Sequence, residues 1–210
     1  MPTKNVLKEY GEDEYYHAYN RGVAKMEIFR DEQDYAYMLG LFKRHLSRDP
    51  AVDKKGRAVP HYACQVELVA YCLMPNHFHF LYYLKEKQGI EKLMRSMMTA
   101  YSRYFNNKYA RVGPVFQSNF LAARITSDTY LWHVSRYIHL NPLDIGASPR
   151  SYDYSSLGYF SGKRTAEWLH PEKLVQTKKE VEEYMRSITD HESYHVLRNY
   201  IKHELAAVDE

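Results

Sequence analysis

The stretch over residues 64–84, CQVELVAYCLMPNHFHFLYYL, restricts the possible folds more than any other part of the chain. It reads as two apolar β segments separated by a Met-Pro-Asn break at residues 74–76. The second segment carries His77 and His79 with one residue between them. Because side chains alternate between the two faces of a strand, both imidazoles are expected on one face.

Phe78 and Phe80 are expected on the opposite face of the same strand. Two imidazoles at this spacing can bind one divalent cation or one phosphate. A His-x-His pair also occurs by chance in many strands, where the histidines are only exposed or hydrogen-bonded. The rest of the chain has to decide between these interpretations.

The order of the predicted elements indicates the fold class. From apolar periodicity, caps and breakers, we expect a strand over 14–21, a helix capped by Asp31, the two β segments, a helix over 90–109, a strand over 120–125 and a helix over 127–140. This order predicts an α+β, ferredoxin-like (RRM-like) antiparallel sheet with helices packed on one face. In such a fold the histidines lie on a central strand and the last helix packs nearby.

The chain divides into three predicted parts. Residues 1–13 are polar and are expected to be flexible, residues 14–162 form one domain, and residues 163–210 form a C-terminal helical extension. Over residues 172–207 we expect one or two charged, exposed helices.

Charge is unevenly distributed along the chain. The net charge is +3, but residues 87–150 hold nine Lys and Arg against three acids, which leaves the remainder negative. A positive middle segment is typical of a polyanion-binding site, and a solvated basic face explains it equally well. The 21 tyrosines are compatible with base stacking, although most are expected to be structural.

The cysteines and the apolar runs favour a cytoplasmic protein without a membrane segment. Cys64 and Cys72 have no redox or zinc-binding spacing and are interpreted as small core residues. The first residues lack the apolar core of a secretory signal, and no run approaches the length of a membrane span.

Tyr137 and Asn141 lie one helical turn apart at the end of the helix over 127–140. If they lie across from His77 and His79, two imidazoles and one amide oxygen could bind Mg²⁺ or Mn²⁺ and leave positions for phosphate oxygens. The Tyr137 hydroxyl would then be directed at a phosphodiester. A buried helix tyrosine and a helix-terminal asparagine are the structural alternatives.

Several motifs resemble one family. PNHFHFLYY resembles the His-hydrophobe-His motif of the HUH single-tyrosine transposases, and RYIHLNPL resembles their tyrosine helix. The segments YNRGVAKMEIFRDEQDY, YSRYFNNKYARVGPVFQSNF and SYDYSSLGYF resemble the REP-associated branch of these IS200-like transposases. The resemblance implies that His77 and His79 are metal ligands, Tyr137 is the nucleophile and Asn141 is the third ligand.

The resemblance also implies a function. Such an enzyme cuts single-stranded DNA near hairpins through a covalent 5′-phosphotyrosine, uses Mg²⁺ or Mn²⁺, and works in bacteria in association with the nucleoid. It acts as a monomer or as a homodimer that exchanges the tyrosine helix. Candidate DNA-binding residues are Arg103, Lys108, Arg111, Arg124 and Arg136, with Tyr104 and Tyr109 as candidate stacking residues.

Two other functions compete with this one. A non-catalytic DNA-hairpin-binding protein of the same fold is the alternative, and the intact histidines, tyrosine and asparagine count against it. A hydrolase of small phosphoesters would need a general base and a deep pocket, neither of which is evident in the sequence.

Overall fold

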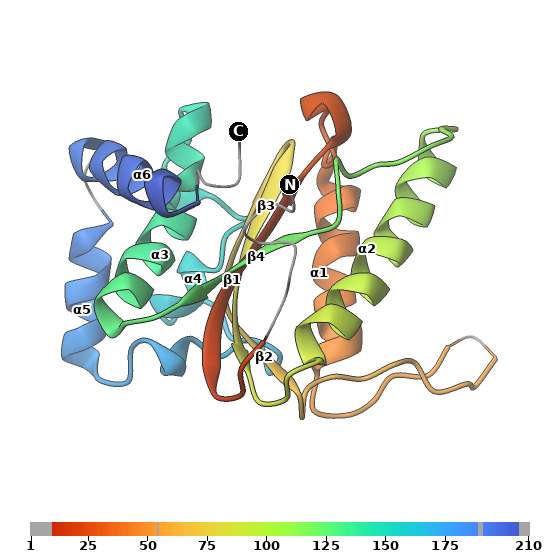
Figure 1. Cartoon of the computed structure of the whole chain (residues 1–210), viewed down its shortest axis with the longest axis horizontal. Helices are drawn as coiled ribbons and strands as arrows, with labels where there is room; N and C mark the ends of the chain where they lie inside the picture. Colours follow the sequence, from red (N-terminus) through yellow and green to blue (C-terminus); the bar gives the residue numbers. More distant parts are fainter. Residues whose placement is uncertain (1–9, 54, 189–190, 206–210) are drawn as a thin grey trace.

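A four-stranded antiparallel sheet forms the centre of the molecule (Figure 1). The computed structural model describes residues 10–53, 55–188 and 191–205. The strands are β1 (Glu14–Arg21), β2 (Val66–Met74), β3 (His77–Leu84) and β4 (Leu121–Ile125), in the order β2-β3-β1-β4. This order and the βαββαβ sequence of elements confirm the predicted ferredoxin-like α+β fold, with the histidines on a central strand.

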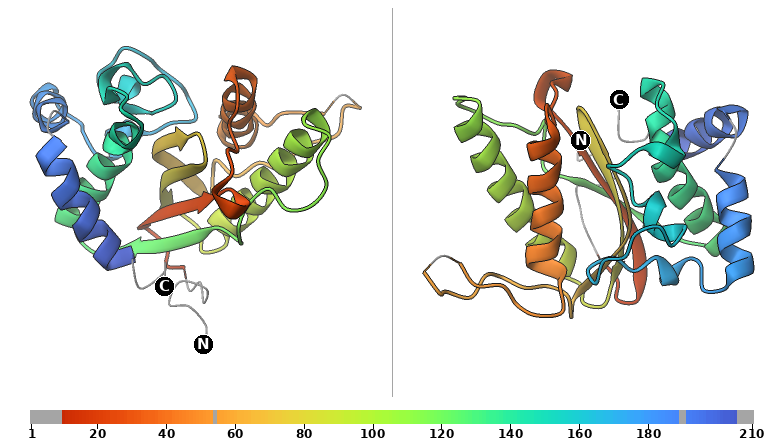
Figure 2. Two further views of the ribbon diagram at one scale, coloured as in Figure 1. Left: turned by 90° about the horizontal axis from the view of Figure 1, so that it is seen from above. Right: turned by 180° about the vertical axis from the view of Figure 1, so that it is seen from behind.

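Helices α1 (Glu32–Leu46) and α2 (Gly89–Lys108) cover one face of the sheet (Figures 1 and 2). Asp31 caps α1 as predicted, because its carboxylate accepts hydrogen bonds from the backbone N–H groups of Gln33 and Asp34. Phe78 and Phe80 of β3 belong to the core beneath α1 and α2. The side chains of β3 therefore alternate as the sequence predicts.

Helix α3 (Asp128–Leu140) lies on the opposite face, with α4 (Leu157–Phe160), α5 (Lys178–Ser187) and α6 (His191–Leu205) (Figures 1 and 2). Helices on a single face were expected, so the prediction is wrong for α3. The reason is that Val69, Cys72 and Leu81 on the second face of the sheet are also apolar, and α3 covers them. Burial on both faces explains why every residue of β2 is buried.

The C-terminal segment is more buried than expected. In α5 and α6, Tyr184, Tyr194, Leu197 and Ile201 are buried in the core around α3. Positions 194, 197 and 201 recur at helical spacing and form an apolar stripe on α6. The prediction of helices in this segment is confirmed, but the prediction that they are exposed is wrong for these four residues.

Two smaller predictions concern the cysteines and the N-terminus. Cys72 is buried, but Cys64 is exposed because it precedes β2 in a turn, so its placement in the core is wrong. Of the predicted flexible N-terminal residues, 1–9 lie outside the described residues. Tyr10 is buried against the edge of Tyr16, with ring centroids 5.0 Å apart.

None of the helices in the described part of the chain has both the length and the apolar composition needed to cross a bilayer.

Candidate active site

The two β3 histidines face α3, and each uses Nδ1 for a hydrogen bond. His77 Nδ1 lies 2.6 Å from Oδ1 of Asn76, the last residue of the turn before β3. His79 Nδ1 lies 2.9 Å from Nε2 of His17, a buried residue of β1. In both rings Nε2 is the nitrogen not used by these bonds.

Tyr137 of α3 lies directly beside this pair. Its ring centroid is 5.3 Å from that of His79, with the planes at 77°, and 6.2 Å from that of His17. On its other side lies Tyr194 of α6, with ring centroids 6.2 Å apart and nearly parallel planes. Only 7% of the Tyr137 surface is exposed. The tyrosine thus sits next to the histidines of its own chain.

Asn141 follows the last residue of α3 and is oriented by the helix end. Its Nδ2 donates to the Tyr137 backbone carbonyl at 2.7 Å, which turns Oδ1 toward His77. The distance from Asn141 Oδ1 to His77 Nε2 is 3.4 Å. Helix α3 ends at Leu140, and the chain continues as a 3₁₀ helix over Asn141–Ile145 with Pro142 in its first turn.

The hydrogen bonds around His77 fit a cation. The Asn76 amide oxygen can only accept, so the proton of neutral His77 belongs on Nδ1 and Nε2 carries a lone pair. Asn141 Oδ1 is also an acceptor, so two lone pairs face one another. Adjacent ligands of a six-coordinate Mg²⁺ at its usual bond lengths are separated by about 3 Å. The observed 3.4 Å separation is close to that spacing.

Burial favours the neutral, ligand form of these imidazoles. It lowers the pKa of His77 and His79, and it lowers the pKa of His17 to about 3. Within the described residues, no three His, Cys, Asp or Glu side chains gather as a metal site. The candidate ligand set is instead His77, His79 and the amide oxygen of Asn141.

The predicted DNA-binding residues are spread over several elements. Arg103 is exposed on α2, and its guanidinium has no hydrogen bond or ion pair within the described ranges. Lys108 is engaged by two carboxylates, with Nζ 2.5 Å from Asp31 and 2.8 Å from Asp34. Arg111 reaches Asn106 of α2.

The remaining two arginines lie closer to the sheet and to α3. Arg124 of β4 pairs with Glu14 of β1. Arg136 of α3 donates to the Ser187 carbonyl at 2.9 Å. The structure therefore does not gather the five predicted cations at one point.

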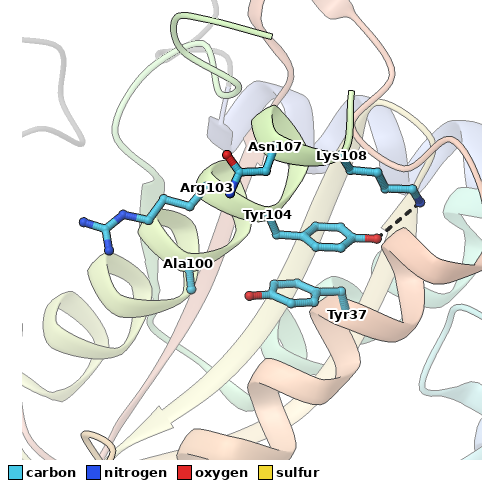
Figure 3. A pocket seen from close by; sticks show the side chains of 6 residues that line it. All are labelled: Tyr37, Ala100, Arg103, Tyr104, Asn107 and Lys108. Carbon is cyan, nitrogen blue, oxygen red and sulfur yellow. Dashed lines mark hydrogen bonds between the residues drawn. The ribbon is translucent and has the colours of Figure 1, made fainter. Parts of the chain in front are cut away.

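A shallow groove of about 610 Å³ lies along α1 and α2 (Figure 3). It is lined by Tyr37, Ala100, Arg103, Tyr104, Asn107 and Lys108. Tyr104 stacks on Tyr37 with ring centroids 3.9 Å apart, and Arg30 lies 4.6 Å above the ring of Tyr109. One face of each candidate stacking tyrosine is thus covered.

His17 and Arg21 are site residues that sequence reasoning missed. Arg21 pairs with His77 in the β1–β3 register, which places both on one face, and its guanidinium hydrogen-bonds Gln117. The alternation in EYYHAYNR predicts that positions 17 and 21 share a face. Only the register between β1 and β3 brings them to the histidines.

Comparisons with known proteins give a family match for part of the chain and a fold likeness. Residues 52–141 match the family model of the IS200-like transposases. The resemblance to IS200-like transposases is confirmed. The matched segment includes both histidines, Tyr137 and Asn141, and it supports a role as a DNA-binding transposase.

A solved structure with a similar fold is that of a REP-associated tyrosine transposase bound to a REP hairpin. It is 14% identical in sequence, with a TM-score of 0.54 over 73% of this chain and 82% of that chain. This likeness shows that the two chains share a fold over more than the segment matched by the family model. No curated protein sequence matches this chain.

Proposed function

We propose that this protein is a metal-dependent single-stranded DNA endonuclease and strand transferase that cuts near DNA hairpins. The observation that carries the proposal is the contact of Tyr137 with His79, at 5.3 Å between ring centroids, beside the facing acceptors of His77 and Asn141. A nucleophile and a candidate cation site are thereby adjacent. The hairpin bound to the structurally similar transposase supports hairpin DNA as the partner.

His77, His79 and Asn141 would hold Mg²⁺ or Mn²⁺, through two imidazole nitrogens and one amide oxygen. When bound, such an ion supplies Lewis-acid polarisation of a phosphate oxygen. Asn76 orients the His77 ring, and the end of α3 orients the Asn141 amide. Both ligand atoms would therefore be in place before DNA binds.

Tyr137 would perform the covalent step. Its Oη forms a bond to phosphorus and gives up its proton to solvent, while the bond from phosphorus to the 3′ oxygen breaks and that oxygen takes up a proton. The products are a 5′-phosphotyrosine and a DNA end with a free 3′-hydroxyl. Attack of a 3′-hydroxyl on the phosphotyrosine reverses the step and rejoins the strand.

Strand cleavage is tested by incubation of the protein with a single-stranded hairpin oligonucleotide labelled on the 3′ side of the cleavage site. We expect a protein–DNA adduct in denaturing gels that requires Mn²⁺ or Mg²⁺ and disappears in Tyr137→Phe. Tyr130→Phe is the matched control, since Tyr130 lies two turns earlier on α3, and it should retain the adduct. An adduct that persists in Tyr137→Phe would contradict the assignment of the nucleophile.

A non-catalytic hairpin-binding protein is the second candidate. The observation that favours it is the low exposure of Tyr137 beneath Tyr194. It predicts hairpin binding that weakens with salt, survives Tyr137→Phe and His77→Ala, and yields no adduct with any metal. Binding in a gel-shift assay together with no adduct would therefore favour this candidate.

The division of the chain and its oligomeric state are parts of the same proposal. We assign residues 14–162 to the catalytic unit and residues 163–210 to an extension that packs on α3 through α5 and α6. Because Tyr137 lies beside its own histidines, a monomer suffices for the proposed reaction, and exchange of the tyrosine helix in a homodimer is not required.

A further inference from the structure

His17 lies next to the site, but the proposed reaction gives this residue no direct role. It lies on β1, has no exposed surface, and stacks on His79 with ring centroids 5.0 Å apart and planes at 25°. In the register, His17 pairs with Leu81 and His79 pairs with Tyr19, so the two imidazoles meet diagonally across β1 and β3. Their closest nitrogens, His17 Nε2 and His79 Nδ1, are 2.9 Å apart.

A hydrogen bond between two neutral imidazoles requires one donor and one acceptor. If His79 Nδ1–H donates, His79 Nε2 carries a lone pair and can ligate a cation. If His17 Nε2–H donates instead, the proton of His79 lies on Nε2 and the ring cannot ligate there. The partner of Nδ1 therefore decides whether His79 is ready to bind a metal.

Stability alone explains His17 poorly. Its second nitrogen, Nδ1, is buried without a hydrogen-bond partner in the described structure. A buried polar atom without a partner is unfavourable compared with an apolar side chain of similar shape at the same place. A phenylalanine would fill the position without that cost, so the useful atom at position 17 is Nε2.

The neighbouring ligand has the same arrangement. His77 Nδ1 donates to Asn76 Oδ1 at 2.6 Å, which also leaves Nε2 as the lone-pair nitrogen. Both candidate ligands thus have a dedicated partner on Nδ1, one from the turn before β3 and one from β1.

We propose that His17 is a positioning residue for His79, which accepts its Nδ1–H and holds the ring with Nε2 directed to the metal site. The proposal rests on the proposed function, in which His79 is a metal ligand. His17 acts through His79 and does not itself contact the ion or the DNA.

The first test compares Mn²⁺ affinity, measured by electron paramagnetic resonance and calorimetry, among variants of the full chain. His17→Phe keeps a ring but removes the acceptor, and the affinity should fall about 10–100-fold. His17→Gln restores an acceptor and should recover most of the affinity. His45→Phe is the matched control, since His45 is a buried histidine on α1 with one backbone partner at 2.6 Å, and the affinity should not change.

The second test needs neither metal nor a folded variant. Long-range ¹H–¹⁵N NMR spectra of the metal-free wild-type protein report which nitrogen of His79 carries the proton. Protonation on Nδ1 is expected, and protonation on Nε2 would overturn the proposal. The position of this proton tests the proposal even if His17→Phe fails to fold.

The outcomes separate the two proposals. If wild type binds Mn²⁺ and His17→Phe binds it equally well, the role of His17 is wrong and the proposed function stands. If wild type binds no Mn²⁺ through His77 and His79, the proposed function fails, and with it the role of His17.

Discussion

At the scale of single residues, the site depends on where lone pairs point. His77 Nε2 and Asn141 Oδ1 face one another at 3.4 Å, and their other atoms are held by Asn76 and the Tyr137 carbonyl. Two acceptors held in contact repel one another, and a cation bound by both removes that repulsion. The amide of Asn141 is therefore expected to contribute to metal binding as well as to the helix end.

We predict that Asn141→Leu lowers the Mn²⁺ affinity at least tenfold, because loss of a direct ligand costs no less than loss of a supporting hydrogen bond. Asn141→Asp keeps an oxygen at the same reach and should bind Mn²⁺ at least as well as wild type. Calorimetric titration of the metal-free proteins measures both. Unchanged affinity in Asn141→Leu would remove Asn141 from the ligand set.

At the scale of elements, a polar cluster joins the start of α1 to the end of α2. Asp34 has no exposed side-chain surface and accepts hydrogen bonds from Lys108, Tyr104, Tyr109 and the Arg30 backbone at 2.8–2.9 Å. Burial by itself would raise the pKa of Asp34, but these hydrogen bonds outweigh it and hold the pKa below its ordinary value of 3.8.

We predict that Asp34→Asn lowers the free energy of unfolding by about 3 kcal/mol at pH 7, because it breaks a buried, hydrogen-bonded ion pair. Since the folded-state pKa of Asp34 is lowered, its contribution is complete above pH 3.8 and is lost as the pH falls through the lowered value. The difference between variant and wild type should shrink in acid. Urea unfolding at pH 7 and pH 3 measures it.

Asp31→Asn is the control for this prediction. Its carboxylate is half exposed, and asparagine caps a helix as well as aspartate does, so the loss should be much smaller. Equal losses in both variants would show that the burial of Asp34 does not matter.

At the scale of the whole molecule, the sheet separates two chemical regions. The candidate metal site lies between the sheet and α3, whereas the exposed cation Arg103 lies on α2, over the opposite face (Figures 1 and 3). Lys108 is close to Arg103 in sequence but is neutralised by Asp31 and Asp34. The two cations are therefore expected to respond differently to DNA.

We predict that Arg103→Ala weakens hairpin binding and reduces the slope of log K against log salt by about 1, as expected for one lost phosphate contact. Lys108→Ala should leave that slope nearly unchanged and lower thermal stability instead. Fluorescence anisotropy over a salt series, together with thermal unfolding, separates the effects. A slope reduced equally by both variants would show that Lys108 leaves its carboxylates to bind DNA.

Local patterns predicted the parts of the fold that depend on few residues. Asp31 was predicted as a helix cap, and its carboxylate accepts hydrogen bonds from the first turn of α1. The predicted break between β2 and β3 is also confirmed. Lys108 shows the limit of such patterns, because the carboxylates that engage it are more than 70 residues away in sequence.

The sequence by itself determined that His77 and His79 share a face and that Tyr137 and Asn141 lie one turn apart, because strand alternation and helical spacing follow from local backbone geometry. Only the tertiary structure decided that α3 packs on the histidine face, because apolar positions on both faces of the sheet could have received it. It also decided that His17 meets His79, because the register between two strands depends on contacts that span the whole chain.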